Sequence, residues 1–137
     1  MDPAIQIREV YIDSTAAKEH DGEALDVLTG VLGSLAIEQV ATPEEADVMI
    51  IMGGDGTFLH SLRRNRFPNI PVTGINTGTL GFYMDTKPTE EAISAMVQHL
   101  VDGTFAVKSL PLLEVPVGQT EAVEYATNEV VVDHRGS

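Results

Sequence analysis

The sequence contains no cysteine, and aromatic residues make up only 5% of it. The absence of cysteine excludes disulfide bonds, thiolate chemistry and zinc sites of the cysteine type. Cations are also scarce, because 8 lysines and arginines stand against 21 aspartates and glutamates, for a net charge of −13. Such a surface repels duplex nucleic acid and anionic membranes. A small anionic ligand stays possible, since backbone amides can bind phosphate locally whatever the global charge.

The chain also lacks a long apolar run. Its longest one, Val48–Met52, is far too short to cross a bilayer. The first residues are neither basic nor followed by an apolar core, so we expect no signal peptide. With 137 residues, of which 43% are hydrophobic, the composition is typical of a globular domain. Together these features favour a cytoplasmic protein with no nucleic-acid or membrane partner.

Strand and helix patterns alternate over roughly the first hundred residues. This alternation predicts an α/β fold, with an open, mostly parallel sheet and flanking helices. The predicted strands are Val10–Ile12, a short one near Ile37 and Val40, Val48–Met52 and Pro71–Ile75. Three helices are predicted. The first carries the apolar stripe Leu25, Leu28, Leu32 and Leu35, and the second runs from about Thr57 to Arg64. The third starts at Pro88 and has the apolar face Ile93, Met96, Val97, Leu100 and Val101.

Several polar residues predict where these helices begin and end. Ser14 or Thr15 is expected to cap the first helix. The run from Thr42 to Glu45 is typical of a capping box with proline at the first helical position. Asp102 followed by Gly103 is expected to end the last helix.

The pattern changes after Gly103, where strand-like segments follow one another without a helix. We predict strands at Phe105–Lys108, Leu112–Val117 and Tyr125–Val132. The change places a domain junction near residues 109–111. Residues 1–108 would then form an α/β nucleotide-binding domain, and residues 109–137 would begin a second, all-β domain.

A glycine-rich loop, Gly53-Gly54-Asp55-Gly56-Thr57, follows a buried strand and opens a helix. Glycines let the backbone turn sharply and approach a ligand closely, and a helix N-terminus favours an anion. Asp55 beside a polyphosphate would have to hold a metal ion or take a proton. The loop is neither a Walker loop nor a Rossmann fingerprint. The alternative is a tight strand-to-helix turn in which Asp55 is the N-cap.

Two further segments carry candidate ligand contacts. Asn76 and Thr77 follow another buried strand, at the edge where ligands sit in open α/β sheets, and Phe82 and Tyr83 could wall an aromatic ligand. The alternative is a connector whose aromatics belong to the core. The pair Asn128-Glu129 interrupts an apolar strand, and an exposed edge position would explain it equally well.

The order Gly-Gly-Asp-Gly-Thr, Asn-x-Gly-x-Leu-Gly-Phe and Asn-Glu resembles the NAD kinase family, over about Glu45 to Val132. The first motif is shared with lipid kinases and phosphofructokinases, and the other two separate NAD kinases from them. The resemblance implies transfer of the terminal phosphoryl group of ATP, or of polyphosphate, to the 2′-hydroxyl of the adenosine ribose of NAD, with magnesium or another divalent cation. It implies Asp55 as general base. It implies nucleotide contacts from Gly53, Gly54, Gly56, Thr57, His60, Asn76, Phe82, Tyr83, Asn128 and Glu129.

Some of this assignment stays open on the sequence alone. His60 is as compatible with plain surface, and Arg63, Arg64 and Arg66 favour a solvated helix end over a phosphate contact. The family's downstream Asp-Gly and Thr-Pro-Thr/Ser-Gly-Ser motifs do not occur before Ser137. We therefore expect the second domain and much of the NAD pocket to be incomplete, and the dimers or tetramers of family members to belong to the complete protein. A lipid or sugar kinase of the same superfamily, or a non-catalytic nucleotide-binding module, is the alternative.

Overall fold

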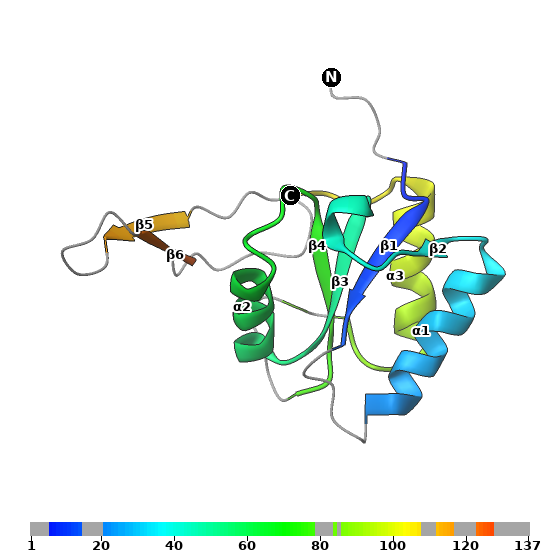
Figure 1. Ribbon diagram of the computed structural model, residues 1–137. Helices are drawn as coiled ribbons and strands as arrows, with labels where there is room; N and C mark the ends of the chain where they lie inside the picture. The colour runs from blue at the N-terminus through cyan, green and yellow to red at the C-terminus, as the bar shows by residue number, and fades with distance from the viewer. Residues whose placement is uncertain are drawn as a thin grey trace.

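The computed structural model describes residues 6–14, 21–78, 84, 86–107, 112–116 and 123–127. Figure 1 shows a sheet with helices packed on both of its faces. The elements are β1 (Glu9–Asp13), α1 (Gly22–Ser34), β2 (Glu38–Gln39), the 3-10 turn η2 (Pro43–Glu45), β3 (Val48–Gly53), α2 (Asp55–Arg64), β4 (Val72–Asn76), α3 (Glu90–Asp102), β5 (Leu112–Pro116) and β6 (Val123–Thr127).

The main sheet has four strands in the order β2-β1-β3-β4, and all of its strand pairs are parallel. The predicted open parallel sheet with flanking helices is therefore confirmed. The chain winds from β1 outward to β2, then returns to β3 and winds the other way to β4. Such a reversal between β1 and β3 is the point at which open α/β sheets form a crevice at the carboxyl ends of their strands.

β3 is buried on both faces, as the continuous apolar run predicted, because all six of its residues are buried. Successive side chains of a strand point to opposite faces. Val48, Ile50 and Met52 belong to the core cluster that contains α1 and α3. Met49 and Ile51 belong to the second cluster, with residues of α2. The two helical layers are thus held by one strand (Figure 1).

The helices on the first face follow the predicted stripes, with one exception. Leu28 and Leu32 of α1 are fully buried. α3 begins after Thr89, whose hydroxyl accepts a hydrogen bond from the Ala92 N–H at 3.2 Å, and it ends at Gly103 with a left-handed φ of 70°. Val101 was expected on the buried face, and it is 39% exposed. It lies about 80° around the helix axis from Ile93, at the border of the stripe.

Two predicted helix starts are wrong in detail, and a third, at Thr42 and Pro43, is correct in place but lacks the predicted capping bond. The N-cap position of α1 is Asp21, not Ser14, and Thr15 lies outside the described residues. Thr42 occupies the N-cap position of η2 but makes no capping side-chain hydrogen bond, so no capping box forms there. α2 begins at Asp55 rather than at Thr57, with Gly54 as N-cap. The alternative in which Asp55 is the N-cap is therefore wrong.

The segment after α3 differs from its prediction at first and agrees with it later. Residues 104–107 form no strand, and Val107 is 56% exposed, so the strand predicted from Phe105 is wrong over its described part. Phe105 instead packs against the core cluster of α1 and α3. β5 and β6 pair antiparallel, with Leu112 opposite Thr127, in agreement with two predicted strands. The predicted junction at residues 109–111 lies outside the described residues and stays a prediction.

A polar cluster joins β1 to the last turn of α2. Asp13 ends β1 opposite Ile51 and is 2% exposed. Its Oδ2 atom accepts hydrogen bonds from the Ser61 hydroxyl, from Arg64 Nη2 at 2.6 Å and from Asn65 Nδ2 at 2.9 Å. A buried carboxylate costs several kcal/mol of hydration, and these donors compensate for it. We call Asp13, Ser61, Arg64 and Asn65 the Asp13 cluster.

Tyr11 lies on the same strand and face as Asp13. Burial raises the pKa of its phenol above the ordinary value of 10.0, and the negative charges of Asp13 and Glu44 raise it further against the opposing charge of Arg64. The neutral phenol is therefore favoured in the folded state. This stabilisation is present below the unfolded pKa and is lost as the pH rises through the folded pKa.

We expect Thr89→Ala to lower the free energy of unfolding by about 0.5–2 kcal/mol, because α3 loses its N-terminal cap. Urea denaturation measures this, and the m value should not change. Thr29→Ala is the matched control, since Thr29 lies inside α1 and its hydroxyl bonds only to the Asp26 carbonyl of the preceding turn. An equal loss of stability in both variants would show that the Thr89 cap contributes nothing specific.

We expect Tyr11→Phe to become more stable relative to the unmodified protein as the pH rises above about 10. The unmodified protein loses stability there because the phenol of Tyr11 loses its proton at a lower pH in the unfolded state than in the folded state. Lysines and other tyrosines cancel when the two proteins are compared. Urea denaturation at several pH values from about 8 to 11 measures the difference. A difference that is constant over this range would contradict the raised pKa.

Candidate functional site

The structure brings the two predicted glycine-rich loops together at one edge of the sheet. In the β3–β4 register, Gly53 lies opposite Asn76. The Thr77 N–H donates to the Gly53 carbonyl at 3.0 Å. A Cβ atom on Gly78 would lie 3.4 Å from the Cα of Gly54. Because both strands are parallel, the loops share the carboxyl-end edge where such sheets bind ligands.

The N-terminus of α2 faces this edge with its backbone groups. The first helical hydrogen bond runs from the Phe58 N–H to the Gly54 carbonyl, at 2.9 Å. The N–H groups of Asp55, Gly56 and Thr57 precede it, and the N-cap residue is Gly54, which has no side chain to cap them. The helix dipole adds a partial positive charge there. The arrangement suits an anion such as a phosphate group.

The glycines of the first loop differ in what the fold requires of them. Gly53 has a φ of 152°, and a Cβ there would lie 2.5 Å from the Thr57 Cγ2. The fold therefore needs glycine at position 53. A Cβ on Gly54 or Gly56 would meet no described atom within 4 Å. The described structure leaves open space beside these two residues, which is what close approach of a ligand to the backbone needs.

Asn76 organises the second loop through its side-chain amide. Its Oδ1 accepts from the Gly78 N–H at 3.0 Å, and its Nδ2 donates to the Met84 carbonyl at 3.3 Å. Its backbone N–H donates to the Thr86 carbonyl at 2.8 Å. These bonds hold the loop against the residues that follow it, so the described contacts of Asn76 are internal to the protein.

The structure describes some of the remaining predicted contacts, and others lie outside its ranges. His60 is exposed on α2. Arg64 was expected at a solvated helix end, but it donates to the buried Asp13, while Arg63 and Arg66 are exposed. Four predicted contacts lie outside the described residues, so their roles stay predictions: Phe82, Tyr83, Asn128 and Glu129.

Asp13 is a residue that the sequence reasoning missed. It is the last residue of a short strand. The one signal in the sequence is that a carboxylate stands at a position where a buried apolar side chain would be expected. An acidic residue that is almost fully buried requires partners. Those partners are 48 to 52 residues away in the sequence, so no local pattern identifies them.

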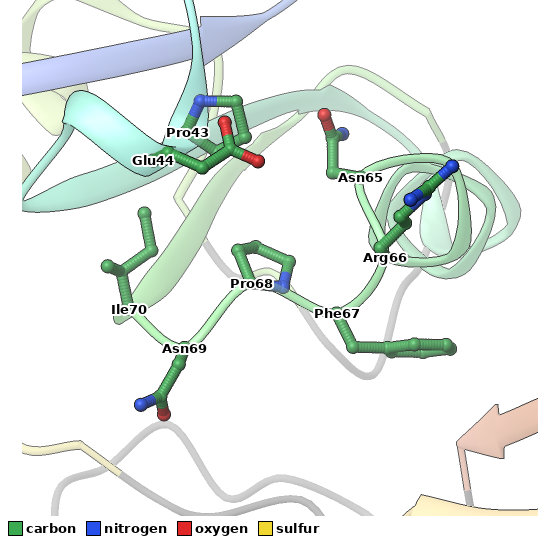
Figure 2. Close-up of a pocket in the computed structure, with 8 residues that line it drawn as sticks. All are labelled: Pro43, Glu44, Asn65, Arg66, Phe67, Pro68, Asn69 and Ile70. Carbon is green, nitrogen blue, oxygen red and sulfur yellow. The ribbon is translucent and has the colours of Figure 1, made fainter.

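A hollow of about 380 Å³ lies beside the Asp13 cluster, between η2 and the turn after α2 (Figure 2). Ile70, which lines it, lies two residues before β4, and Pro43 and Glu44 precede β3. The hollow therefore lies at the amino-end edge of the strands, opposite the two loops. Arg66 and Phe67 line it with left-handed φ values of 58° and 50°, and their side chains point away from its centre in Figure 2.

Two properties of the described residues bear on cofactors and membranes. Within these ranges, no three acidic or histidine side chains come together in a way that would hold a metal ion. Magnesium is commonly bound by one or two carboxylates together with substrate phosphates, which needs no such cage. None of the described helices combines the length and apolar character that crossing a bilayer requires.

Comparison with known proteins agrees with the arrangement of the two loops. The ATP-NAD kinase N-terminal domain family matches residues 34–105. An NAD kinase of Porphyromonas gingivalis is 37% identical over 114 residues, which cover 83% of this chain and 36% of that protein. An NAD kinase 1 of Halalkalibacterium halodurans is 39% identical over 95 residues, covering 65% of this chain and 35% of that protein. This chain thus spans about a third of the length of these relatives.

A solved structure shares the fold over most of the chain. Yeast NADH kinase complexed with NADH superposes with a TM-score of 0.60 at 15% identity, covering 89% of this chain and 46% of that one. At this identity the likeness shows the fold alone. The family match extends over more than half of the residues and contains both glycine-rich loops. The chain therefore belongs to the NAD kinase family, within the domain described as the ATP-NAD kinase N-terminal domain.

Proposed function

We propose that this chain is the nucleotide-binding part of an NAD kinase, which transfers the terminal phosphoryl group of ATP or polyphosphate to the 2′-hydroxyl of the adenosine ribose of NAD. The observation that carries the proposal is the junction of the two loops at the N-terminus of α2, where a Cβ on Gly54 or Gly56 would meet no described atom. A fold that needed only a tight turn would not require glycine at these two positions.

Asp55 is the residue to which we assign the proton transfer. It is the first residue of α2 and follows Gly53, which lies opposite Asn76 of the second loop, by two positions. Its carboxylate would take the proton of the 2′-hydroxyl as the phosphoryl group is transferred. General-base catalysis typically contributes about 10²–10⁴-fold to a rate. Positioning and charge neutralisation supply the rest in phosphoryl transfer.

The charge of the protein bears on how the phosphates are neutralised. The net charge is −13, so the two nucleotides approach a surface of their own sign. The backbone N–H groups at the start of α2 supply a local positive potential. Magnesium, when bound, would neutralise the phosphates further, and Asp55 is the loop carboxylate available to help hold it. We place the reaction in the cytoplasm, because the chain is free of cysteine.

NAD and NADH are both candidate acceptors. The relatives of bacterial origin are named NAD kinases, and the yeast neighbour was solved with NADH. The two dinucleotides share the adenosine ribose, which carries the hydroxyl that is phosphorylated. Assembly into a homo-oligomer belongs to the proposal for the complete protein only.

We expect Asp55→Asn to lower the rate of NADP formation from NAD and ATP with magnesium by about 10²-fold or more, because the general base is lost. Nucleotide affinity should change little, since the backbone N–H groups stay in place. A coupled assay for NADP measures turnover, and calorimetry measures affinity. Turnover at the unmodified rate would rule out Asp55 as the base. Preferred phosphorylation of a lipid would point to the alternative kinase class.

We expect Gly56→Ala to stabilise the fold and to weaken nucleotide binding. Alanine is a better helix former than glycine by up to about 1 kcal/mol, and the Cβ meets no described atom. The same Cβ would occupy the space that the nucleotide needs. Gly30→Ala is the matched control, because Gly30 is an exposed helical glycine of α1 with equally open surroundings.

The midpoint temperature of thermal unfolding should rise in both variants, whereas the affinity for ATP and NAD, measured by calorimetry, should fall in Gly56→Ala alone. This comparison does not require the protein to be catalytically active. Equal nucleotide affinity in the two variants would mean that no ligand approaches Gly56.

A further inference from the structure

We propose that Asp13 is a positioning residue, which sets where α2 lies along the sheet and thereby places Asp55 and the N–H groups of the first loop. Asp13 lies on β1 opposite Ile51, and its carboxylate bonds to the last turn of α2 and to the residue after it. It acts from the opposite end of α2, through the hydrogen bonds of the Asp13 cluster. That these groups serve phosphoryl transfer rests on the proposed function, whereas their placement by Asp13 does not.

The apolar contacts of α2 leave its position loosely defined. The helix has ten residues, and its buried apolar side chains are Phe58 and Leu62. They form one cluster with Met49 and Ile51 of β3, and the partly buried Leu59 packs against it. Hydrophobic contact is non-directional, so a short helix held by such side chains can roll with little loss of buried area.

The connection between β3 and α2 fixes where the helix begins but not the direction of its axis. Gly54 alone joins the two elements, and Gly53, the last residue of β3, packs against Thr57. Glycine has the widest backbone freedom of any residue, so Gly54 allows the helix to leave the strand at different angles. The direction of α2, and with it the orientation of the N–H groups at its start, therefore needs a constraint from elsewhere in the fold.

The Asp13 cluster supplies a directional constraint at the other end. Three donors from one helical turn and its C-cap converge on a single carboxylate oxygen of a central strand. Hydrogen bonds weaken steeply when their angle or distance changes. The ten-residue helix is about 14 Å long and contains no proline, so a displacement of its last turn carries to its first.

Stability alone does not explain the cluster. The C-terminal end of a helix repels negative charge, and Asp13 lies at that end of α2. Apolar residues of similar size often replace a buried ion pair with equal or greater stability. In the cluster, a buried Ser61 and a 35% exposed Arg64 side chain bind the same carboxylate oxygen. An apolar replacement would lose these directional bonds.

The amide chemical shifts of Asp55, Gly56 and Thr57 in the ligand-free protein test the placement. We expect Asp13→Asn to shift all three, although the hydrogen bonds that it weakens lie at the other end of α2. Ser61→Ala is the milder second variant, because it removes one donor and leaves the carboxylate buried with two. Ile93→Val and Leu32→Ala are the controls. Both residues lie in the layer on the other face of the sheet. The first substitution is a mild and the second a severe core truncation, so together they bracket the loss of stability expected in Asp13→Asn.

The controls should leave the three amide shifts unchanged when all proteins are folded by circular dichroism. Shift changes confined to Asp13, its strand and the last turn of α2 would overturn the proposal. So would equal changes at the three amides in the control variants, because general loosening would then explain them.

Nucleotide binding adds the functional readout. A misplacement of about 1 Å can cost up to 10²-fold in rate, so we expect ATP affinity or turnover to fall by about tenfold in Asp13→Asn and to stay unchanged in the controls. If the unmodified protein binds no nucleotide, the proposed function fails, and the amide shifts still decide the positioning role. Unaltered amide shifts in a nucleotide-binding protein would reject the positioning role and leave the proposed function standing.

Discussion

β3 is buried on both faces, and the positions of the helices and loops follow from that burial. Its alternate side chains hold α1 and α3 on one face and α2 on the other. Its pairing with β4 places Gly53 opposite Asn76, which brings the two glycine-rich loops to one edge. Its pairing with β1 places Asp13 opposite Ile51, within reach of the last turn of α2. One strand therefore sets both ends of the helix that carries the candidate catalytic residue.

The glycines of the site serve two different purposes. Gly53 and Gly74 are needed by packing, since a Cβ at the first would meet Thr57 and at the second would meet Met84 and the Ile51 carbonyl. Gly54 and Gly56 are not needed by the described packing. A nucleotide-binding loop combines both kinds, because its backbone must be held rigidly on one side and left bare on the other. This contrast separates the phosphate-binding interpretation from a plain tight turn more sharply than the motif itself does.

The distribution of charge explains how an acidic protein can hold anions. The net charge of −13 makes long-range attraction of a nucleotide unfavourable, so affinity has to come from short-range contacts. Backbone N–H groups at the start of α2 act at such range, and water exclusion strengthens them. Arg64 is not available for this task, because it neutralises the buried Asp13 at the other end of the helix. The cations near the end of α2 are thus divided between a structural role and the solvent.

The element types and the two loops could be predicted from the sequence, because they depend on local periodicity and on glycine chemistry. The apolar stripe of α1, the buried run of β3 and the end of α3 at Gly103 are properties of neighbouring residues, and the α/β fold class follows from the alternation of strands and helices. The sequence could not predict Asp13, the pairing of Arg64, or the irregular course of residues 104–107, because each depends on contacts between distant segments. It also could not separate Gly53, which the fold requires, from Gly56, which it does not. The sequence by itself determined the succession of strands and helices up to α3 and the two glycine-rich loops. Only the tertiary structure decided which of them meet, because strand register and side-chain burial are set by packing across the sheet rather than along the chain.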